Sequence, residues 1–98
     1  MFRSLIGGGG SAFTAQEPEN NIVRGAYIAL AAAFSGAQTM ALPTYDEAYT
    51  IPSAKAQLIA LRTMQICAEE SGAADTADPL GGAYYVEALT NAMEERIV

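Results

Sequence analysis

Ala37-Gln38-Thr39-Met40-Ala41-Leu42 is the stretch that decides the fold of this chain. It is a short apolar run that follows a helix-ending glycine and is closed by Pro43, so it predicts a buried strand. No other stretch of the sequence is a convincing strand. Because a buried strand without a neighbour leaves its backbone donors and acceptors unsatisfied, this run is expected to pair with strands that the chain does not itself contain.

The segment before this run predicts a long helix. Asn20 or Asn21 is expected to cap it, with Glu17 and Glu19 near its positive end, and it continues to about Ser35. Apolar residues recur at helical spacing, and alanines widen the apolar face almost to the whole circumference. Such a helix is expected to have neighbours on most of its sides.

Two further helices are predicted after the strand. Residues 46–49 are expected to form one helical turn, and Pro52-Ser53 starts a helix that ends near Ser71. A loop rich in Asp, Pro and Gly follows, and a last helix runs from about Ala83 to Arg96. The order helix, short strand, helix, helix predicts a mostly helical α/β chain, which fits the closing part of an α/β barrel better than a free-standing bundle. A complete barrel needs about 250 residues.

The composition excludes several classes of protein. The chain has 98 residues and a net charge of −6, and its five basic residues are scattered, which predicts no nucleic-acid partner. It has no histidine and one cysteine, Cys67, so the sequence predicts no metal site, no internal disulfide and a reduced, cytoplasmic setting. Residues 25–43 are apolar, but Ser35-Gly36 interrupts them, which favours a buried helix and strand over a membrane span.

The glycine run of residues 7–10, followed by Ser11, has two interpretations. It lacks the Lys and the Ser or Thr of a phosphate-binding loop, which leaves that function weakly supported. A flexible linker, native or designed, is the favoured interpretation. Residues 1–10 are therefore expected to be a flexible segment, with a folded unit over residues 11–98.

Three motifs carry a resemblance to a known family. They are Thr14-Ala15-Gln16-Glu17-Pro18-Glu19-Asn20-Asn21-Ile22-Val23-Arg24, Asp46-Glu47-Ala48 and Asp78-Pro79-Leu80-Gly81-Gly82-Ala83-Tyr84-Tyr85. Together with their spacing, they resemble the last part of the barrel domain of the adenosylcobalamin-dependent acyl-CoA mutases, the methylmalonyl-CoA mutase family. The resemblance implies a partial TIM (β/α)8 barrel over residues 11–98.

The resemblance also implies site residues. Gly10 matches a glycine that lets the backbone approach the corrin ring of the cofactor, and Glu47 and Thr50 match positions at the cobalamin and adenosyl face. Gln38 matches a glutamine that faces the acyl-CoA channel. The family's His-Thr-Gln run before the glycine is replaced here by Leu5-Ile6-Gly7. No residue is expected to be catalytic, because the cofactor supplies the radical chemistry and the protein encloses it.

Two functions follow from these features. By resemblance, the chain is a fragment or split subunit of such an isomerase, acting with the remaining barrel and a cobalamin-binding domain or subunit, and inactive alone. No cobalt ligand is expected here, since the family's ligand is a histidine. The alternative is a non-catalytic helical interaction module derived from the same barrel. Asn20, Asn21 and Arg24 are expected to be structural, with Arg24 paired to Glu17 or Glu19.

Overall fold

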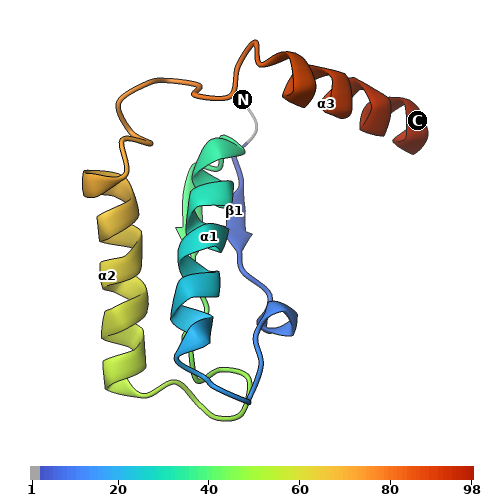
Figure 1. The fold of residues 1–98 in the computed structure, drawn as a ribbon. Coiled ribbons are helices and arrows are strands. Elements are labelled where there is room, and N and C mark those ends of the chain that lie inside the picture. The colour runs from blue at the N-terminus through green and yellow to red at the C-terminus, as the bar shows by residue number, and fades with distance from the viewer. Residues whose placement is uncertain (1–2) are drawn as a thin grey trace.

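The computed structural model describes residues 3–98 (Figure 1). Its elements are β1 (Leu5–Gly7), a 3₁₀ turn η1 (Gly10–Ala12), α1 (Asn20–Phe34), β2 (Thr39–Ala41), α2 (Ala54–Glu70) and α3 (Tyr84–Ile97). The three helices confirm the sequence prediction to within one or two residues at each end. The chain is thus α/β and mostly helical.

The sheet corrects the expectation that no second strand exists. Leu5–Gly7 pairs with β2 in parallel, with Leu5 opposite Thr39, Ile6 opposite Met40 and Gly7 opposite Ala41. Two parallel strands joined through a helix form a β-α-β unit, and α2 then follows the second strand as a second strand-helix repeat. Within residues 3–98 the sheet has only these two strands, and an isolated pair of short strands is marginally stable in water.

Helix α1 covers one face of the sheet. Gly25 lies against Leu42, because a methyl group added at Gly25 would be 3.5 Å from Cδ2 of Leu42. Ala29 and Ala32 are buried on the same helix. Small residues on this face let the helix axis come close to the strands, so that the core is built largely from alanine and backbone rather than from large side chains.

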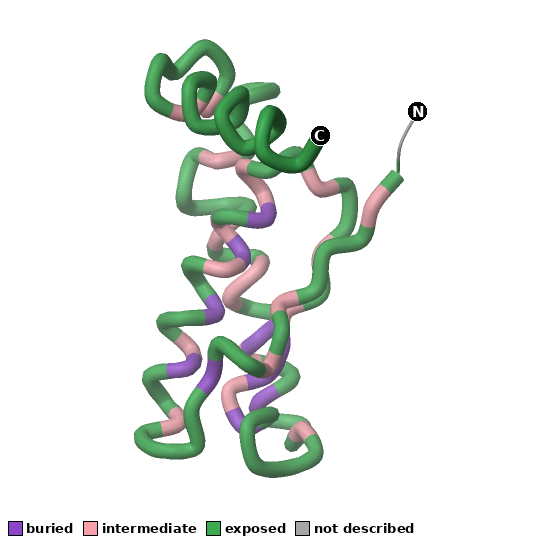
Figure 2. The backbone as a smooth tube through the Cα atoms, turned by 90° about the vertical axis from the view of Figure 1, so that its right-hand side faces the viewer, coloured by how far each residue is buried: buried purple, intermediate pink, exposed green. Residues whose placement is uncertain are grey.

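Helix α2 packs beside α1, and the two run side by side in Figure 1. Ser53 caps α2 as predicted, with its side chain accepting a hydrogen bond from the backbone N–H of Ala56 at 3.1 Å. Ala56 and Ala60 are the buried residues of α2. The buried positions lie on the two helices and in the loops at residues 13 and 43–46, whereas no residue of β1 or β2 is buried (Figure 2).

The ends of these two helices follow the predicted glycine pattern. Gly36 and Gly72 each follow the C-cap residue of their helix, Ser35 of α1 and Ser71 of α2. Both glycines have left-handed φ angles, +78° and +76°. Only glycine adopts this conformation without strain, so each residue stops its helix. The predicted ends near Ser35 and Ser71 are confirmed.

Helix α3 projects away from this core (Figure 1). None of its residues Tyr84–Ile97 is buried, although its apolar positions recur at helical spacing. The radius of gyration is 15.2 Å, against about 13 Å for an independent domain of this length. None of the helices described in residues 3–98 has the length and apolar character needed to cross a bilayer.

Candidate functional site

The loops that follow β1 and β2 meet at one edge of the sheet. The strands are parallel, so both carboxyl ends point the same way, and this is the edge at which α/β barrels build their active sites. Gly10 lies in the first loop and Glu47 in the second. A methyl group added at Gly10 would lie 4.0 Å from Oε1 of Glu47, which is the nearest atom outside the adjoining chain. The structure thus brings together two of the residues predicted for the cofactor face.

At the start of the first loop, packing around Gly8 leaves no space for a side chain. Its backbone N–H donates to the carbonyl oxygen of Ala41 at 3.1 Å and so extends the strand pairing by one residue. A methyl group added there would lie 2.7 Å from Cδ of Pro43 and 3.1 Å from Cγ2 of Ile28. The glycine run is therefore more than a spacer at this position. The mobility of the glycine run in solution remains a prediction.

Asp46 fastens the second loop to the start of α2. It is buried, its Oδ1 accepts from the hydroxyl of Thr44 at 2.7 Å, and its Oδ2 accepts from the backbone N–H of Ser53 at 3.0 Å. The hydrogen bond from the Ser53 N–H, opposed by burial and aided by Thr44, lowers the pKa of Asp46 below its ordinary value of 3.8. Asp46 is therefore a structural carboxylate that holds the neighbouring Glu47 in place.

Glu47 and Thr50 are exposed at this edge. The predicted helical turn is confirmed, since the N–H of Thr50 donates to the carbonyl oxygen of Asp46 at 3.0 Å and that of Glu47 to Thr44 at 3.0 Å. In the same turn, desolvation and then the charge of Asp46 raise the pKa of the Tyr49 phenol. The turn exposes a carboxylate and a hydroxyl, neither of which is hydrogen-bonded to another residue of the described range 3–98.

Asn21 joins the two loops from the first turn of α1. Its Oδ1 accepts from the backbone N–H of Thr14 at 3.1 Å, while its Nδ2 donates to the carbonyl oxygens of Thr14 at 2.8 Å and Tyr45 at 2.9 Å. It is 1% exposed, and it is the only large side chain in the described part of the chain that is fully buried. Its predicted role as a helix cap is wrong, because the cap position is Glu19 and no side chain caps it.

The predicted pairing of Arg24 is also wrong. Its Nη1 donates to Oδ1 of Asn21 at 2.9 Å and to Oγ1 of Thr14 at 3.2 Å. Asn20, by contrast, is exposed and donates to Oε2 of Glu17 at 3.3 Å. The structural role predicted for this group therefore holds, but the partner of Arg24 is an amide rather than a carboxylate.

Gln38 lies away from this edge. The strand begins at Thr39, so Gln38 precedes it, is exposed, and stands at the amino end of β2 beside Arg3 and Ser4. The prediction that it lies inside a buried strand is wrong, because pairing covers only the three residues opposite β1. Gln38 and Glu47 are thus at opposite ends of the same strand.

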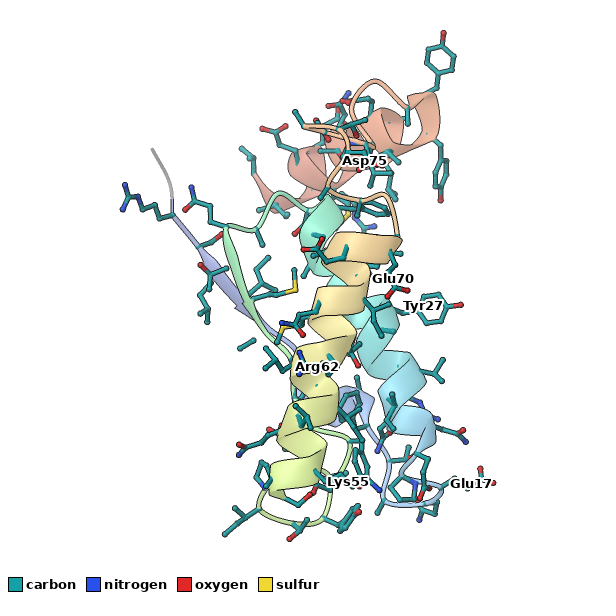
Figure 3. The ribbon with its side chains drawn as sticks, turned by 90° about the vertical axis from the view of Figure 1, so that its left-hand side faces the viewer. Glu17, Tyr27, Lys55, Arg62, Glu70 and Asp75 are labelled. Atoms are coloured by element: carbon teal, nitrogen blue, oxygen red, sulfur yellow. The ribbon has the colours of Figure 1, made fainter. Side chains whose placement is uncertain are left out.

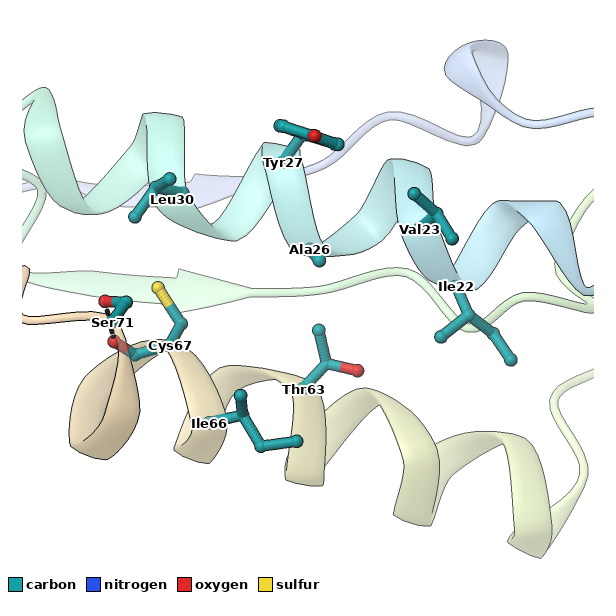
Figure 4. Close-up of a pocket in the computed structure, with 9 residues that line it drawn as sticks. All are labelled: Ile22, Val23, Ala26, Tyr27, Leu30, Thr63, Ile66, Cys67 and Ser71. Carbon is teal, nitrogen blue, oxygen red and sulfur yellow. Dashed lines mark hydrogen bonds between the residues drawn. The ribbon is translucent and has the colours of Figure 1, made fainter.

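A separate apolar groove runs between the outer faces of α1 and α2 (Figure 4). Its volume is about 390 Å³, and its walls include Val23, Tyr27, Ile66 and the half-buried Cys67. Figure 3 shows the side chain of Tyr27 projecting away from α1, and this residue is 72% exposed. Within residues 3–98, no three His, Cys, Asp or Glu side chains gather in a way that would hold a metal ion.

The sequence is similar to known proteins over most or all of its length. Residues 1–98 match the family described as methylmalonyl-CoA mutase. The chain is 56% identical over 77 residues, 79% of its length, to the 2-hydroxyisobutanoyl-CoA mutase large subunit of Aquincola tertiaricarbonis. It is 46% identical over 86 residues, 88% of its length, to the mitochondrial methylmalonyl-CoA mutase of Mus musculus. It is 38% identical over 96 residues, 98% of its length, to the methylmalonyl-CoA mutase of Rhizobium meliloti.

The chain spans a small part of each relative. The matched regions are 14%, 12% and 14% of the Aquincola, mouse and Rhizobium proteins, respectively. The family match extends over residues 1–98 and so spans the glycine run of residues 7–10.

Proposed function

This chain belongs to the methylmalonyl-CoA mutase family, and we propose that it forms a late segment of the barrel domain of an adenosylcobalamin-dependent acyl-CoA mutase. The observation that carries the proposal is the meeting of Gly10 and Glu47 at the carboxyl edge of a parallel sheet. In a (β/α)8 barrel this edge holds the active site. Sequence similarity and local geometry thus both support a cofactor site at the carboxyl edge of the sheet.

The architecture supports a place inside a larger barrel. A β-α-β unit followed by a second helix is the repeating element of such a barrel. Within residues 3–98 the two strands pair only with each other, so each keeps an outer edge for a further strand. The sheet face opposite α1 is also open, since Leu5 is 67% exposed. In the assembled barrel this face would line the interior.

The residues at the carboxyl edge fit one face of the cofactor. Gly10 carries no side chain, and the nearest atom outside the adjoining chain to the place where a Cβ would stand is Glu47 Oε1 at 4.0 Å, so a flat group has room to approach the backbone. Glu47 and Thr50 are exposed, and their oxygens suit ribose hydroxyls and amide groups. Adenosylcobalamin, when bound, supplies the radical chemistry of this family. The chain supplies no cobalt ligand, because it contains no histidine.

The substrate class we propose is an acyl-CoA. The reaction is an isomerisation, in which a hydrogen and a carbon group exchange places on adjacent carbons, so substrate and product contain the same atoms. Gln38 stands at the amino end of β2, whereas Glu47 lies in the loop beyond its carboxyl end. A long ligand threaded through the barrel would meet Gln38 with its distal part while its reacting carbons lie near the carboxyl edge.

The chain is proposed to work only with the remaining barrel and a cobalamin-binding domain or subunit, and to be inactive alone. Most of the surface that would enclose a substrate lies in the part of the relatives that these residues do not match. The alternative, a non-catalytic helical interaction module, would use the exposed apolar residues of α1 and α2. No separate observation favours it. A cytoplasmic location remains a prediction.

A segment exchange tests the proposed function. This chain would replace the matching segment of the Aquincola large subunit. The chimera, assembled with the partner subunit of that enzyme, would be assayed for adenosylcobalamin binding and for isomerisation of the acyl-CoA for which the enzyme is named. The expected result is binding and turnover by the chimera and none by the 98-residue chain alone. A chimera that folds, by gel filtration and thermal melting, but neither binds nor turns over would contradict the proposal. Turnover by the isolated chain would contradict its dependence on partners.

A further inference from the structure

The amide of Asn21 has every hydrogen-bonding position occupied. An amide side chain offers two acceptor and two donor positions. Here Oδ1 accepts from the Thr14 N–H and from Nη1 of Arg24, and Nδ2 donates to the carbonyl oxygens of Thr14 and Tyr45. A buried polar group that is fully satisfied holds its partners in one arrangement, because every alternative leaves a donor or acceptor unpaired.

The partners of Asn21 belong to the two loops that form the candidate cofactor face. Thr14 follows Gly10 by four positions, and Tyr45 precedes Glu47 by two. The two bonds to the backbone of Thr14 resemble the pairing of adjacent strands, so they fix this residue in both position and orientation. The third bond ties the second loop to the same side chain.

From this arrangement we infer that Asn21 is a positioning residue, which sets the separation of Gly10 and Glu47 without itself reaching the cofactor. The inference rests on the proposed function for its biological meaning. Its structural content, the coupling of the two loops, stands independently. Arg24 supports the same arrangement from one turn further along α1, through Oδ1 of Asn21 and the hydroxyl of Thr14.

Replacing Asn21 by aspartate separates positioning from folding. Asn21→Asp keeps an oxygen to accept from Thr14 N–H and Arg24, but it loses both donated bonds, including the one to Tyr45. The added charge lies in the first turn of α1, where it suits the positive end of the helix. Asn20→Asp is the matched control, because it makes the same charge change at the adjacent exposed position.

The test is a distance measurement between spin labels on the full 98-residue chain without cofactor, in a Cys67→Ala background. Labels at Ser11→Cys and Ala48→Cys, both at exposed positions, report on the two loops. Labels at Ala31→Cys and Ala68→Cys, also exposed, report on α1 and α2. Asn21→Asp is expected to broaden the loop distance distribution and to leave the helix distance unchanged, while Asn20→Asp changes neither. An unchanged loop distance would overturn the inference, as would a wild-type chain in which that distance is already broad.

A second measurement tests whether the loop positioning by Asn21 affects cofactor binding. In the Aquincola chimera, Asn21→Asp is expected to weaken adenosylcobalamin binding roughly ten-fold, while Asn20→Asp leaves it unchanged. Equal affinity for both variants would overturn the positioning role. If the unmodified chimera binds no cofactor at all, the proposed function fails instead, and the spin-label distances still decide whether Asn21 couples the loops.

Discussion

The side-chain amide of Asn21 donates a 2.9 Å hydrogen bond to the carbonyl oxygen of Tyr45, 24 positions along the chain. This bond ties the first turn of α1 to the loop after β2. Removing the amide leaves backbone groups of Thr14 and Tyr45 without these partners in a partly buried setting. Asn21→Ala is therefore expected to lower the free energy of unfolding by about 1–3 kcal/mol, measured by urea denaturation. Asn20→Ala, at an exposed position, should change it far less, and equal losses would contradict this assignment.

Gly8 and Gly9 are expected to differ although they are neighbours in one glycine run. Gly8→Ala places a methyl group 2.7 Å from Cδ of Pro43, which forces backbone or ring to move and should destabilise the chain by about 1–3 kcal/mol. Gly9→Ala meets only the exposed Ser11 hydroxyl at 3.3 Å, and the φ of Gly9, −76°, suits alanine. It should be neutral in the same denaturation experiment. Two neutral variants would show that the loop is not packed against Pro43.

Asp46 makes the stability of the chain depend on pH. Its pKa is lowered in the folded state, chiefly by the N–H of Ser53, so the unfolded chain binds its proton more readily. The stabilisation is fully present above the ordinary value of 3.8 and is lost as the pH falls through that value toward the lowered pKa. Unfolding free energies measured between pH 7 and pH 3 should fall less steeply in Asp46→Asn than in the unchanged chain. Identical slopes would exclude Asp46 as a source of the pH dependence.

Gly10 is expected to matter for the cofactor and little for the fold. Its φ is not left-handed, and a methyl group there would come no closer than 4.0 Å to any atom that it does not neighbour in sequence. Gly10→Ala should therefore leave the thermal melt of the isolated chain unchanged and weaken adenosylcobalamin binding by the Aquincola chimera, because the methyl group stands where the corrin ring is proposed to approach. Gly9→Ala is the control in both measurements. Unchanged binding would remove Gly10 from the cofactor face.

The helices could be predicted from sequence because their signals are local. Ser53 and the glycines at 36 and 72 mark ends within one turn of the chain, and the apolar spacing marks the body of each helix. β1 was missed because its three residues run into glycines, and a strand this short is defined by its pairing with β2 rather than by its own sequence. Pairing is a long-range property that local patterns do not contain.

The candidate site was predicted only in part for a similar reason. The resemblance named Gly10 and Glu47, and the structure brings them together. The role of Asn21 could not be predicted from the sequence, because an asparagine at a helix start is usually a cap. Its hydrogen bond to Tyr45 depends on how the two loops fold. Gln38 was placed in the strand, but the apolar run is longer than the segment that has a partner.

The proposal that the loops carrying Gly10 and Glu47 form a cofactor face is tested most directly by an adenosylcobalamin titration of the Aquincola chimera with Glu47→Gln. Losing a charged acceptor of hydrogen bonds should weaken binding about ten- to a hundred-fold, while the thermal melt without cofactor stays the same, because Glu47 is exposed. Glu70→Gln, an exposed change at the far end of α2, is the matched control and should bind like the parent chimera. Equal affinity of the Glu47→Gln and Glu70→Gln chimeras would contradict the account.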